Sequence, residues 1–140
     1  MLSARELKVF YGVIQGLKGV DIDIHDREIV TLIGSNGAGK TSTLNGIVNL
    51  VRSTGRVNFL NEDISRSQTH QIVRKGLALV PEGRRIFTNL TIEENLRMGA
   101  YNNLAGFTRL RDRMYSLFPR LKERRGQMAG TMSGGEQQML

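Results

Sequence analysis

The feature that most constrains this chain is a glycine-rich segment, Gly34–Thr41, that directly follows an apolar run at Glu28–Ile33. The segment fits the pattern G-x-x-x-x-G-K-[ST] of a phosphate-binding loop. The run before it is nearly uninterrupted in apolar side chains, which is typical of a parallel strand buried on both faces. After it, Leu44, Ile47 and Val48 recur at helical spacing. This order of strand, glycine loop and helix predicts an α/β fold in which the apolar strand is central.

The loop carries the residues expected to bind a nucleoside triphosphate. Its glycines let the backbone turn tightly and point N–H groups inward, at the positive end of the following helix. Lys40 would reach the β- and γ-phosphates, the Thr41 hydroxyl would hold Mg²⁺, and Ser42 is placed to donate to the α-phosphate. The predicted nucleotide-binding residues of this segment are Gly34, Ser35, Asn36, Gly37, Ala38, Gly39, Lys40, Thr41 and Ser42.

Length and composition narrow the class of protein. With 140 residues the chain holds one domain at most. Residues 1–11 lack the pattern of a signal peptide, and no apolar run approaches the roughly 20 residues of a membrane span, so any membrane role is expected to be peripheral. The absence of cysteine excludes thiolate chemistry and favours the cytosol. The net charge of +7 fits nucleic acid, anionic lipid or a phosphorylated small molecule as partner. Basic residues concentrate in 109–125 and predict a solvated face.

Further elements follow from periodicity. Strands are predicted at Leu7–Tyr11, Val20–His25, Gly55–Phe59 and Leu77–Val80, with a helix at Gln68–Lys75. The alternation of apolar and charged residues in the second of these strands predicts one solvent-exposed face. The first half of the chain is therefore expected to be mainly β.

The second half is helical in character. Thr91 and Glu94 have capping-box spacing, which predicts a helix through Met98, and Ser133 and Glu136 repeat that spacing. Another helix is predicted to end at Pro119, with its arginines facing away from an apolar stripe. The stripe is Phe107, Leu110, Met114 and Leu117, and the arginines are Arg109, Arg111 and Arg113.

The segment Met132–Gln138, Met-Ser-Gly-Gly-Glu-Gln-Gln, resembles the signature of ATP-binding-cassette (ABC) ATPases. The signature and the phosphate loop occur together almost only in that family. The resemblance implies that two cassettes dimerise head to tail, so that the signature of one covers the γ-phosphate held by the other. The signature residues implied to contact this nucleotide in trans are Ser133, Gly134, Gly135, Glu136 and Gln137.

Other roles are implied only by the resemblance. Tyr11 matches the aromatic residue that stacks on adenine. Glu82 occupies the position where most cassettes carry a glutamine that senses Mg²⁺ and links to the transmembrane partner, so it is a second candidate for a metal contact. The segments Pro81–Phe87, Leu90–Leu96 and Phe118–Leu121 resemble the cassettes of branched-chain amino acid importers.

The implied fold is a P-loop NTPase core of the ABC cassette type, with an N-terminal antiparallel β subdomain and an α-helical subdomain. Residues 1–82 would form the β subdomain and phosphate-loop core, and residues 83–140 the helical subdomain with the signature. The C-terminal part of the cassette is missing, and the catalytic glutamate and second Mg²⁺ ligand are expected beyond Leu140. We therefore expect a marginally stable chain that does not hydrolyse ATP alone. Arg27 departs from the glycine usual in the family, which costs about 1 kcal/mol if φ is positive there.

The leading hypothesis is the ATP-binding subunit of an importer, on the cytoplasmic face of the membrane. Its expected cofactors are ATP and Mg²⁺, and its expected partners are a second cassette, transmembrane permease subunits and, indirectly, a substrate-binding protein. One alternative is a truncated cassette that binds nucleotide without hydrolysing it. Another is a soluble cassette acting on nucleic acid. The roughly hundred residues between Gly34 and Ser133 leave no room for a long coiled-coil insertion, which argues against nucleic acid as partner.

Overall fold

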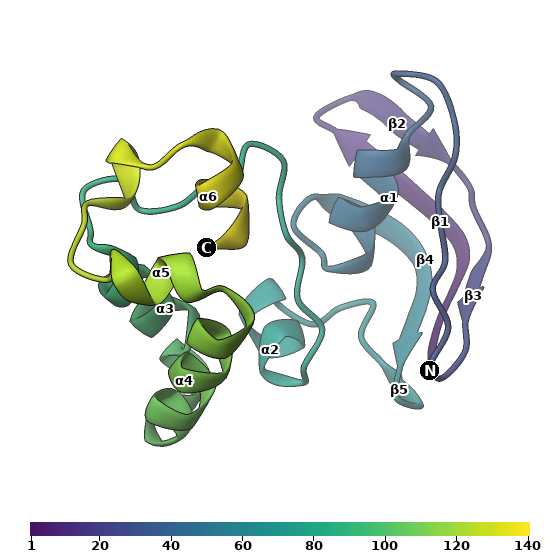
Figure 1. Cartoon of the computed structure of the whole chain (residues 1–140). Helices are drawn as coiled ribbons and strands as arrows, with labels where there is room; N and C mark the ends of the chain where they lie inside the picture. The colour runs from purple at the N-terminus through teal and green to yellow at the C-terminus, as the bar shows by residue number, and fades with distance from the viewer. The chain divides into compact units, whose positions relative to one another are not determined.

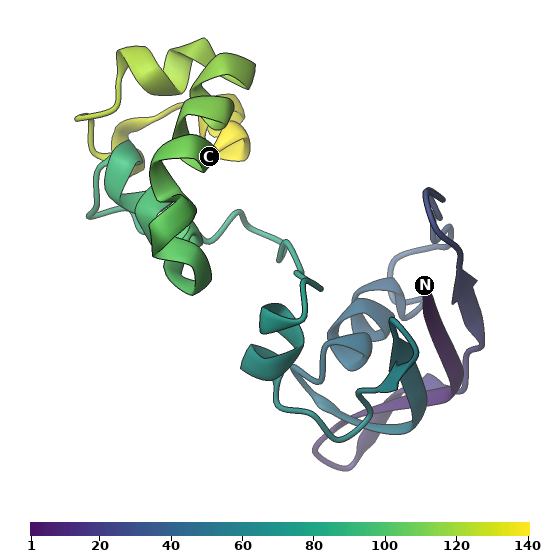
Figure 2. The ribbon, with the colours of Figure 1, turned by 90° about the horizontal axis from the view of Figure 1, so that it is seen from below.

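The computed structural model describes residues 1–140, the whole chain, and divides them into two compact units, Met1–Leu79 and Val80–Leu140. The strands lie in the first unit together with two helices, and the second unit is helical (Figures 1 and 2). Each unit has its own cluster of buried apolar side chains.

The first unit is built on an antiparallel sheet in which β1 (Leu2–Tyr11) is central. β1 pairs with β4 (Arg52–Phe59) along its length, with β3 (Ile22–Ile24) over its first residues and with β2 (Ile14–Lys18) over its last. β5 (Glu62–Asp63) extends the sheet beyond β4. The three strands predicted within β1, β3 and β4 are confirmed, and β2 lies outside the predicted strands.

Helix α1 (Lys40–Ile47) packs on this sheet, as the periodicity after the glycine loop predicts. The approach is close at Gly46, where a Cβ atom would lie 2.6 Å from Cγ2 of Val9. Glycine at this position therefore lets the helix reach β1. A second predicted helix is confirmed as α2 (Thr69–Arg74). The largest fully buried side chains of this unit are Leu7, Ile64, Ile72, Val9 and Val57.

A bulge interrupts the pairing of β1 with β4 between Arg5 and Lys8. Glu6 takes a φ of 50° there and donates its backbone N–H to Asp21 Oδ1 at 2.6 Å. Gly55 stands across from it with a φ of 102°, and a Cβ on Gly55 would lie only 2.5 Å from the Glu6 carbonyl oxygen. Both the dihedral angle and the space at this position thus require glycine.

The prediction of a buried central strand at Glu28–Ile33 is wrong for this structure. The segment forms no strand, and the side chains of Ile29 and Ile33 are 95% and 93% exposed. The predicted strand at Leu77–Val80 is also absent. A parallel strand is stable only between hydrogen-bonded neighbours and under helices on both faces. Neither segment has a neighbouring strand to pair with in this structure. An apolar pattern alone is therefore not enough to form a strand.

The turn before this segment contains a backbone conformation that favours glycine. Arg27 has a φ of 60°, which lies in the left-handed region where a Cβ atom crowds the following carbonyl oxygen. The φ of Arg27 is therefore positive, the case in which arginine in place of the family's usual glycine is costly. The strain amounts to about 1 kcal/mol.

The second unit packs short helices around a small core. α3 (Ile92–Gly99) begins at a complete capping box, because Thr91 Oγ1 accepts the Glu94 N–H at 3.2 Å and the Glu94 carboxylate accepts the Thr91 N–H at 2.8 Å. The pair of contacts confirms the predicted helix start. The remaining elements are the 3-10 helix η1 (Tyr101–Gly106), α4 (Phe107–Leu117), α5 (Pro119–Glu123), the 3-10 helix η2 (Ala129–Thr131) and α6 (Gly134–Met139).

Helix α4 confirms the predicted element but not its predicted faces. Leu117 of the apolar stripe is exposed, and Tyr115 is the buried residue of the helix. Arg111, expected to face away from the core, is half-buried and bonds to Glu93 of α3 at 3.1 Å. Its guanidinium also lies 5.7 Å from the ring centre of Phe107 and 5.9 Å from that of Tyr115. A long side chain can cover apolar surface while its charged end finds a carboxylate, and helical spacing does not capture this.

Substitution of Gly55 by alanine tests the steric requirement at the bulge. We expect the free energy of unfolding, measured by urea denaturation, to fall by about 3 kcal/mol or more, because a Cβ would add a backbone clash to the left-handed strain. Gly76→Ala is the matched control, since Gly76 has a φ of 100° and nothing within 4 Å of an added Cβ. The control should lose only about 1 kcal/mol. Equal losses would show that space at Gly55 is unimportant.

Substitution of Arg27 by glycine should raise the free energy of unfolding by up to about 0.5 kcal/mol, because relief of about 1 kcal/mol of left-handed strain slightly exceeds the added entropy of the unfolded chain. Arg27→Ala removes the same charge but keeps the Cβ, so its stability should stay near that of the parent chain. If both variants changed stability equally, charge and not backbone strain would be the cause.

Candidate functional site

The phosphate loop, residues 34–41, ends in the first turn of α1. Gly37 and Gly39 have φ values of 85° and 91°, and Gly39 is the N-cap of the helix. The Ala38 N–H turns back to the Ser35 carbonyl at 3.1 Å, and the helical ladder begins with the Thr43 N–H and the Gly39 carbonyl at 2.8 Å. The N–H groups of a first helical turn have no acceptor inside the helix. The loop therefore brings its turn to the end of α1 that attracts anions.

Lys40 lies over the loop that precedes it. Its Nζ donates to the carbonyl oxygens of Gly34 and Ser35, both at 2.8 Å. The ammonium group is thereby held beside the backbone that is predicted to receive phosphate, and the loop carries a positive charge on a flexible stem.

Close neighbours crowd two glycines of the loop. A Cβ on Gly34 would lie 2.9 Å from that of Ala38, and one on Gly39 would lie 3.0 Å from Cδ1 of Leu17. Leu17 belongs to β2, so the hairpin of β1 and β2 packs directly against the end of the loop. The shape of the loop thus depends on a strand that sequence reasoning did not find.

The structure brings two of the predicted nucleotide-binding residues together across this junction. Tyr11, the last residue of β1, donates its hydroxyl to Oγ of Ser42 in α1 at 3.2 Å. Tyr11 is 44% exposed, so its side chain remains accessible beside the start of the helix. Adenine stacking by Tyr11 stays a prediction.

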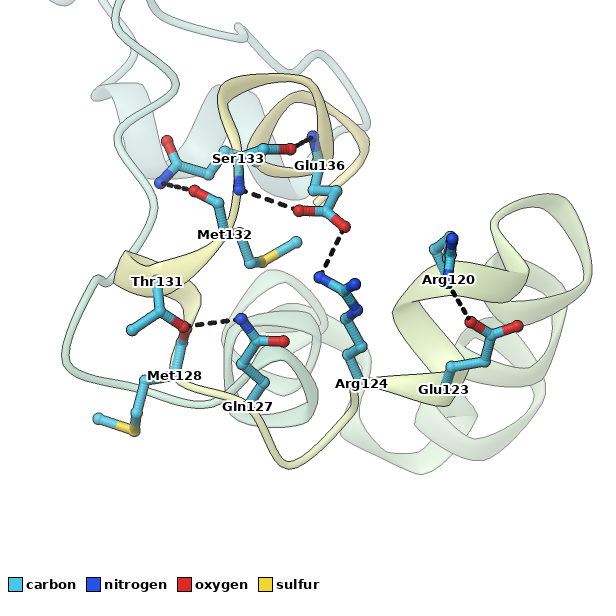
Figure 3. A network of polar contacts seen from close by, with 10 residues as sticks. Arg120, Glu123, Arg124, Gln127, Met128, Thr131, Met132, Ser133 and Glu136 are labelled. Carbon is cyan, nitrogen blue, oxygen red and sulfur yellow. Dashed lines mark hydrogen bonds and ion pairs between the residues drawn. The ribbon is translucent and has the colours of Figure 1, made fainter.

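The signature segment, Met132–Gln138, opens α6 with a second capping box. Ser133 is the N-cap, and its Oγ accepts the Glu136 N–H at 3.4 Å. The Glu136 carboxylate accepts the Ser133 N–H at 2.9 Å and pairs with Arg124 at 2.9 Å (Figure 3). Met132 is buried just before the helix. These contacts fix both the start and the direction of the segment.

The surroundings of Glu136 favour its charged form. The backbone N–H and side chain of Ser133 hold the pKa of the Glu136 carboxyl below its ordinary value of 4.5, and the Arg124 cation acts in the same direction. The Glu94 carboxyl has a lowered pKa for a similar reason, since it accepts from Thr91. Both capping boxes are therefore charged and intact at neutral pH.

The signature segment is also tied to the residues that follow Glu82. Arg84 donates to Oε1 of Gln137 at 3.1 Å, and Gln137 Nε2 donates to the Met132 carbonyl at 3.2 Å. Arg84 has a φ of 62°. Sequence reasoning missed the contacts of Arg84 and Arg124, because their positions in basic stretches gave no sign of which partners they would meet.

Glu82 is exposed and belongs to the second unit, whereas the phosphate loop belongs to the first. The structure holds no group of three or more histidine, aspartate or glutamate side chains arranged for a metal ion. Any Mg²⁺ at the loop would thus be bound by few protein ligands.

The sequence profile of the ABC transporter family matches residues 17–140. The chain belongs to this family. The chain is 46% identical over 142 residues to the high-affinity branched-chain amino acid transport ATP-binding protein BraG of Pseudomonas aeruginosa, covering 100% of this chain and 61% of that protein. It is 31% identical over 144 residues to the lipopolysaccharide export system ATP-binding protein LptB of Escherichia coli K12, covering 99% of this chain and 59% of that protein.

Solved structures show the same fold. The ATP-binding subunit of an ABC transporter aligns with 99% of this chain and 58% of its own length, at 27% identity and a TM-score of 0.83. A dimeric ATP-binding cassette bound to ADP and Pi aligns with 99% of this chain and 66% of its own, at 22% identity and a TM-score of 0.81. The predicted fold class, the N-terminal part of an ABC cassette, is confirmed. The chain spans about three fifths of the length of the relatives it matches. None of its helices has both the length and the apolar character that a membrane span requires.

The lowered pKa of Glu136 predicts how its contacts respond to acid. Their contribution to stability is present above pH 4.5 and is lost as the pH falls through the lowered pKa of the folded state. In an NMR titration, Ser133→Ala and Arg124→Ala should each raise the pKa of Glu136 towards its ordinary value. Lys122→Ala removes a nearby charge with no contact to Glu136 and should leave that pKa in place. If the pKa of Glu136 stayed the same in both the Ser133→Ala and the Arg124→Ala variants, the described contacts would be contradicted.

Proposed function

We propose that this chain is the ATP-binding subunit of an ABC importer, which couples ATP binding and hydrolysis to the transport of branched-chain amino acids or similar substrates. The observation that carries the proposal is that one chain holds two ordered helix starts, each predicted to bind phosphate. One is the phosphate loop at the start of α1, and the other is the capped signature segment at the start of α6. The 46% identity to BraG supports the transport role.

In this proposal the phosphate loop binds ATP. The amides of the loop and of the first turn of α1 surround the phosphates, Lys40 leaves its two carbonyl acceptors to reach the β- and γ-phosphates, and Ser42 donates to the α-phosphate. The exposed ring of Tyr11 lies close enough to this turn to take the base.

A Mg²⁺ ion fits the donor set at the loop. Mg²⁺ prefers oxygen ligands, keeps several waters and is usually held by one or two protein groups together with phosphate oxygens. The hydroxyl of Thr41 supplies one such oxygen, so a three-residue metal cluster is not required. When bound, the ion would neutralise charge that develops on the phosphates. Glu82 is the second candidate for a contact with this ion.

The signature segment serves a second nucleotide. Gly134 and Gly135 place backbone N–H groups at the open end of α6, where a phosphate of a partner cassette would lie, with the capping residue Ser133 beside them. Glu136 and Gln137 act within the chain, by holding Ser133 and Met132 in place. The active unit is accordingly a dimer of cassettes, with each phosphate loop covered by the signature of its partner.

The remaining partners are membrane proteins. We assign permease docking to the helical unit and the residues around Glu82, Arg84 and Arg85, which are exposed. The protein would then bind the cytoplasmic face of the membrane from outside the bilayer, and a substrate-binding protein would act on it indirectly through the permease. An importer of branched-chain amino acids is favoured over an exporter because identity to BraG exceeds that to LptB.

Substitution of Lys40 tests whether the phosphate loop binds ATP. Lys40→Ala should weaken ATP binding by about tenfold to a hundredfold, measured by isothermal titration calorimetry in the presence of Mg²⁺, because one charge-assisted contact to phosphate is lost. Lys122→Ala removes an equal charge from the helical unit and should leave the affinity unchanged. If both variants bound ATP as the parent chain does, the phosphate loop would not be the nucleotide site.

A further inference from the structure

The contact between Tyr11 and Ser42 links the end of β1 to the first turn of α1. The two oxygen atoms lie 3.2 Å apart, and the tyrosine is the donor. The tyrosine ring also packs on Gly16 of β2, where a Cβ atom would lie 2.8 Å from a ring carbon and 3.4 Å from Ser42 Oγ. Tyr11, Gly16 and Ser42 therefore form one close-packed junction.

The direction of this hydrogen bond matters for what Ser42 can do. A phenol is far more acidic than an alkyl hydroxyl, so the tyrosine is the better donor of the pair. Because Ser42 accepts through its oxygen, its own hydrogen remains available to an acceptor elsewhere. Accepting one hydrogen bond also makes a hydroxyl a stronger donor of the next.

The neighbouring residue shows what a hydroxyl in this turn does otherwise. Thr43 Oγ1 donates back to the Gly39 carbonyl at 2.9 Å, the usual use of a helical hydroxyl. The contact formed by Ser42 runs instead to β1, outside the helix. The tyrosine thus keeps this hydroxyl turned away from the helix backbone, at the third residue of α1 and next to the phosphate loop.

The geometry points to Tyr11 as a positioning residue that acts through its hydroxyl. It holds Ser42 Oγ so that the serine hydrogen is directed to an oxygen of the polyphosphate in the loop. This inference rests on the proposed function, since it requires a polyphosphate at α1. It is separate from stacking of the tyrosine ring on a base, because the hydroxyl role concerns the phosphates and does not need adenine.

Two probes and two substitutions separate the hydroxyl from the ring. Tyr11→Phe keeps the ring and removes the hydroxyl, whereas Tyr11→Ala removes both. The probes are ATP and inorganic tripolyphosphate, which has no base, and binding to the 140-residue chain is measured by calorimetry with Mg²⁺. We expect Tyr11→Phe to weaken both probes by about threefold to tenfold, the effect of one hydrogen bond. Tyr11→Ala should weaken tripolyphosphate equally and ATP further.

Ser42 supplies the second arm of the test. Ser42→Ala should weaken both probes, and Tyr11→Phe combined with Ser42→Ala should lose no more than Ser42→Ala alone, because the tyrosine acts through the serine. Tyr101→Phe changes an exposed tyrosine of the other unit and should have no effect. An unchanged urea midpoint for Tyr11→Phe confirms that any loss arises at the site.

The outcomes are distinguishable. If the parent chain binds neither probe, the proposed function and this inference both fail. If the parent chain binds and Tyr11→Phe binds equally well, only the positioning role is overturned. Tighter binding by Tyr11→Phe would also overturn it, because the contact would then restrain Ser42 from the phosphates. Losses that add in the double variant would show that the two hydroxyls act independently, against the proposal.

Discussion

The arrangement of the first unit depends on how closely α1 approaches the sheet. Two glycines make that approach possible, because side chains already fill the space where their Cβ atoms would lie. Gly46 of α1 meets Val9 of β1, and Gly39, the N-cap of α1, meets Leu17 of β2. Dispersion and apolar burial then hold the helix against β1 and β2. The phosphate loop has no core of its own, so its position is set by this contact between a helix and a hairpin.

The second unit depends on a different device, the reciprocal capping of short helices. α3 and α6 each begin with a hydroxyl and a carboxylate that exchange hydrogen bonds with the backbone. α6 has only six residues, too few to be stable through its own hydrogen bonds. Its order comes from Ser133, from the ion pair of Glu136 with Arg124 and from Gln137. The start of the signature segment is therefore fixed by side-chain contacts within the second unit.

Residue spacing in the sequence predicted the elements that depend on interactions between neighbouring residues. Both capping boxes, the glycine loop followed by a helix, and three strands of the sheet were accessible from neighbouring residues in the sequence. The absence of a strand at Glu28–Ile33 was not predictable in this way, because pairing in a parallel sheet depends on partners distant in the chain. The contact of Tyr11 with Ser42 and that of Arg111 with Glu93 also escaped prediction, since each joins elements whose packing no periodicity encodes.

The exposed segment from Ile29 to Ile33 has a consequence for handling the protein. Its five residues are apolar or β-branched, contain no charge and no proline, and lack a hydrogen-bonded neighbour strand. Stretches of this composition pair with copies of themselves when they are left open to solvent. The acidic and basic residues just before it, Asp26, Arg27 and Glu28, act as gatekeepers on one side only. On the other side the phosphate loop follows at once, so self-association through this segment would obstruct the very turn that binds phosphate.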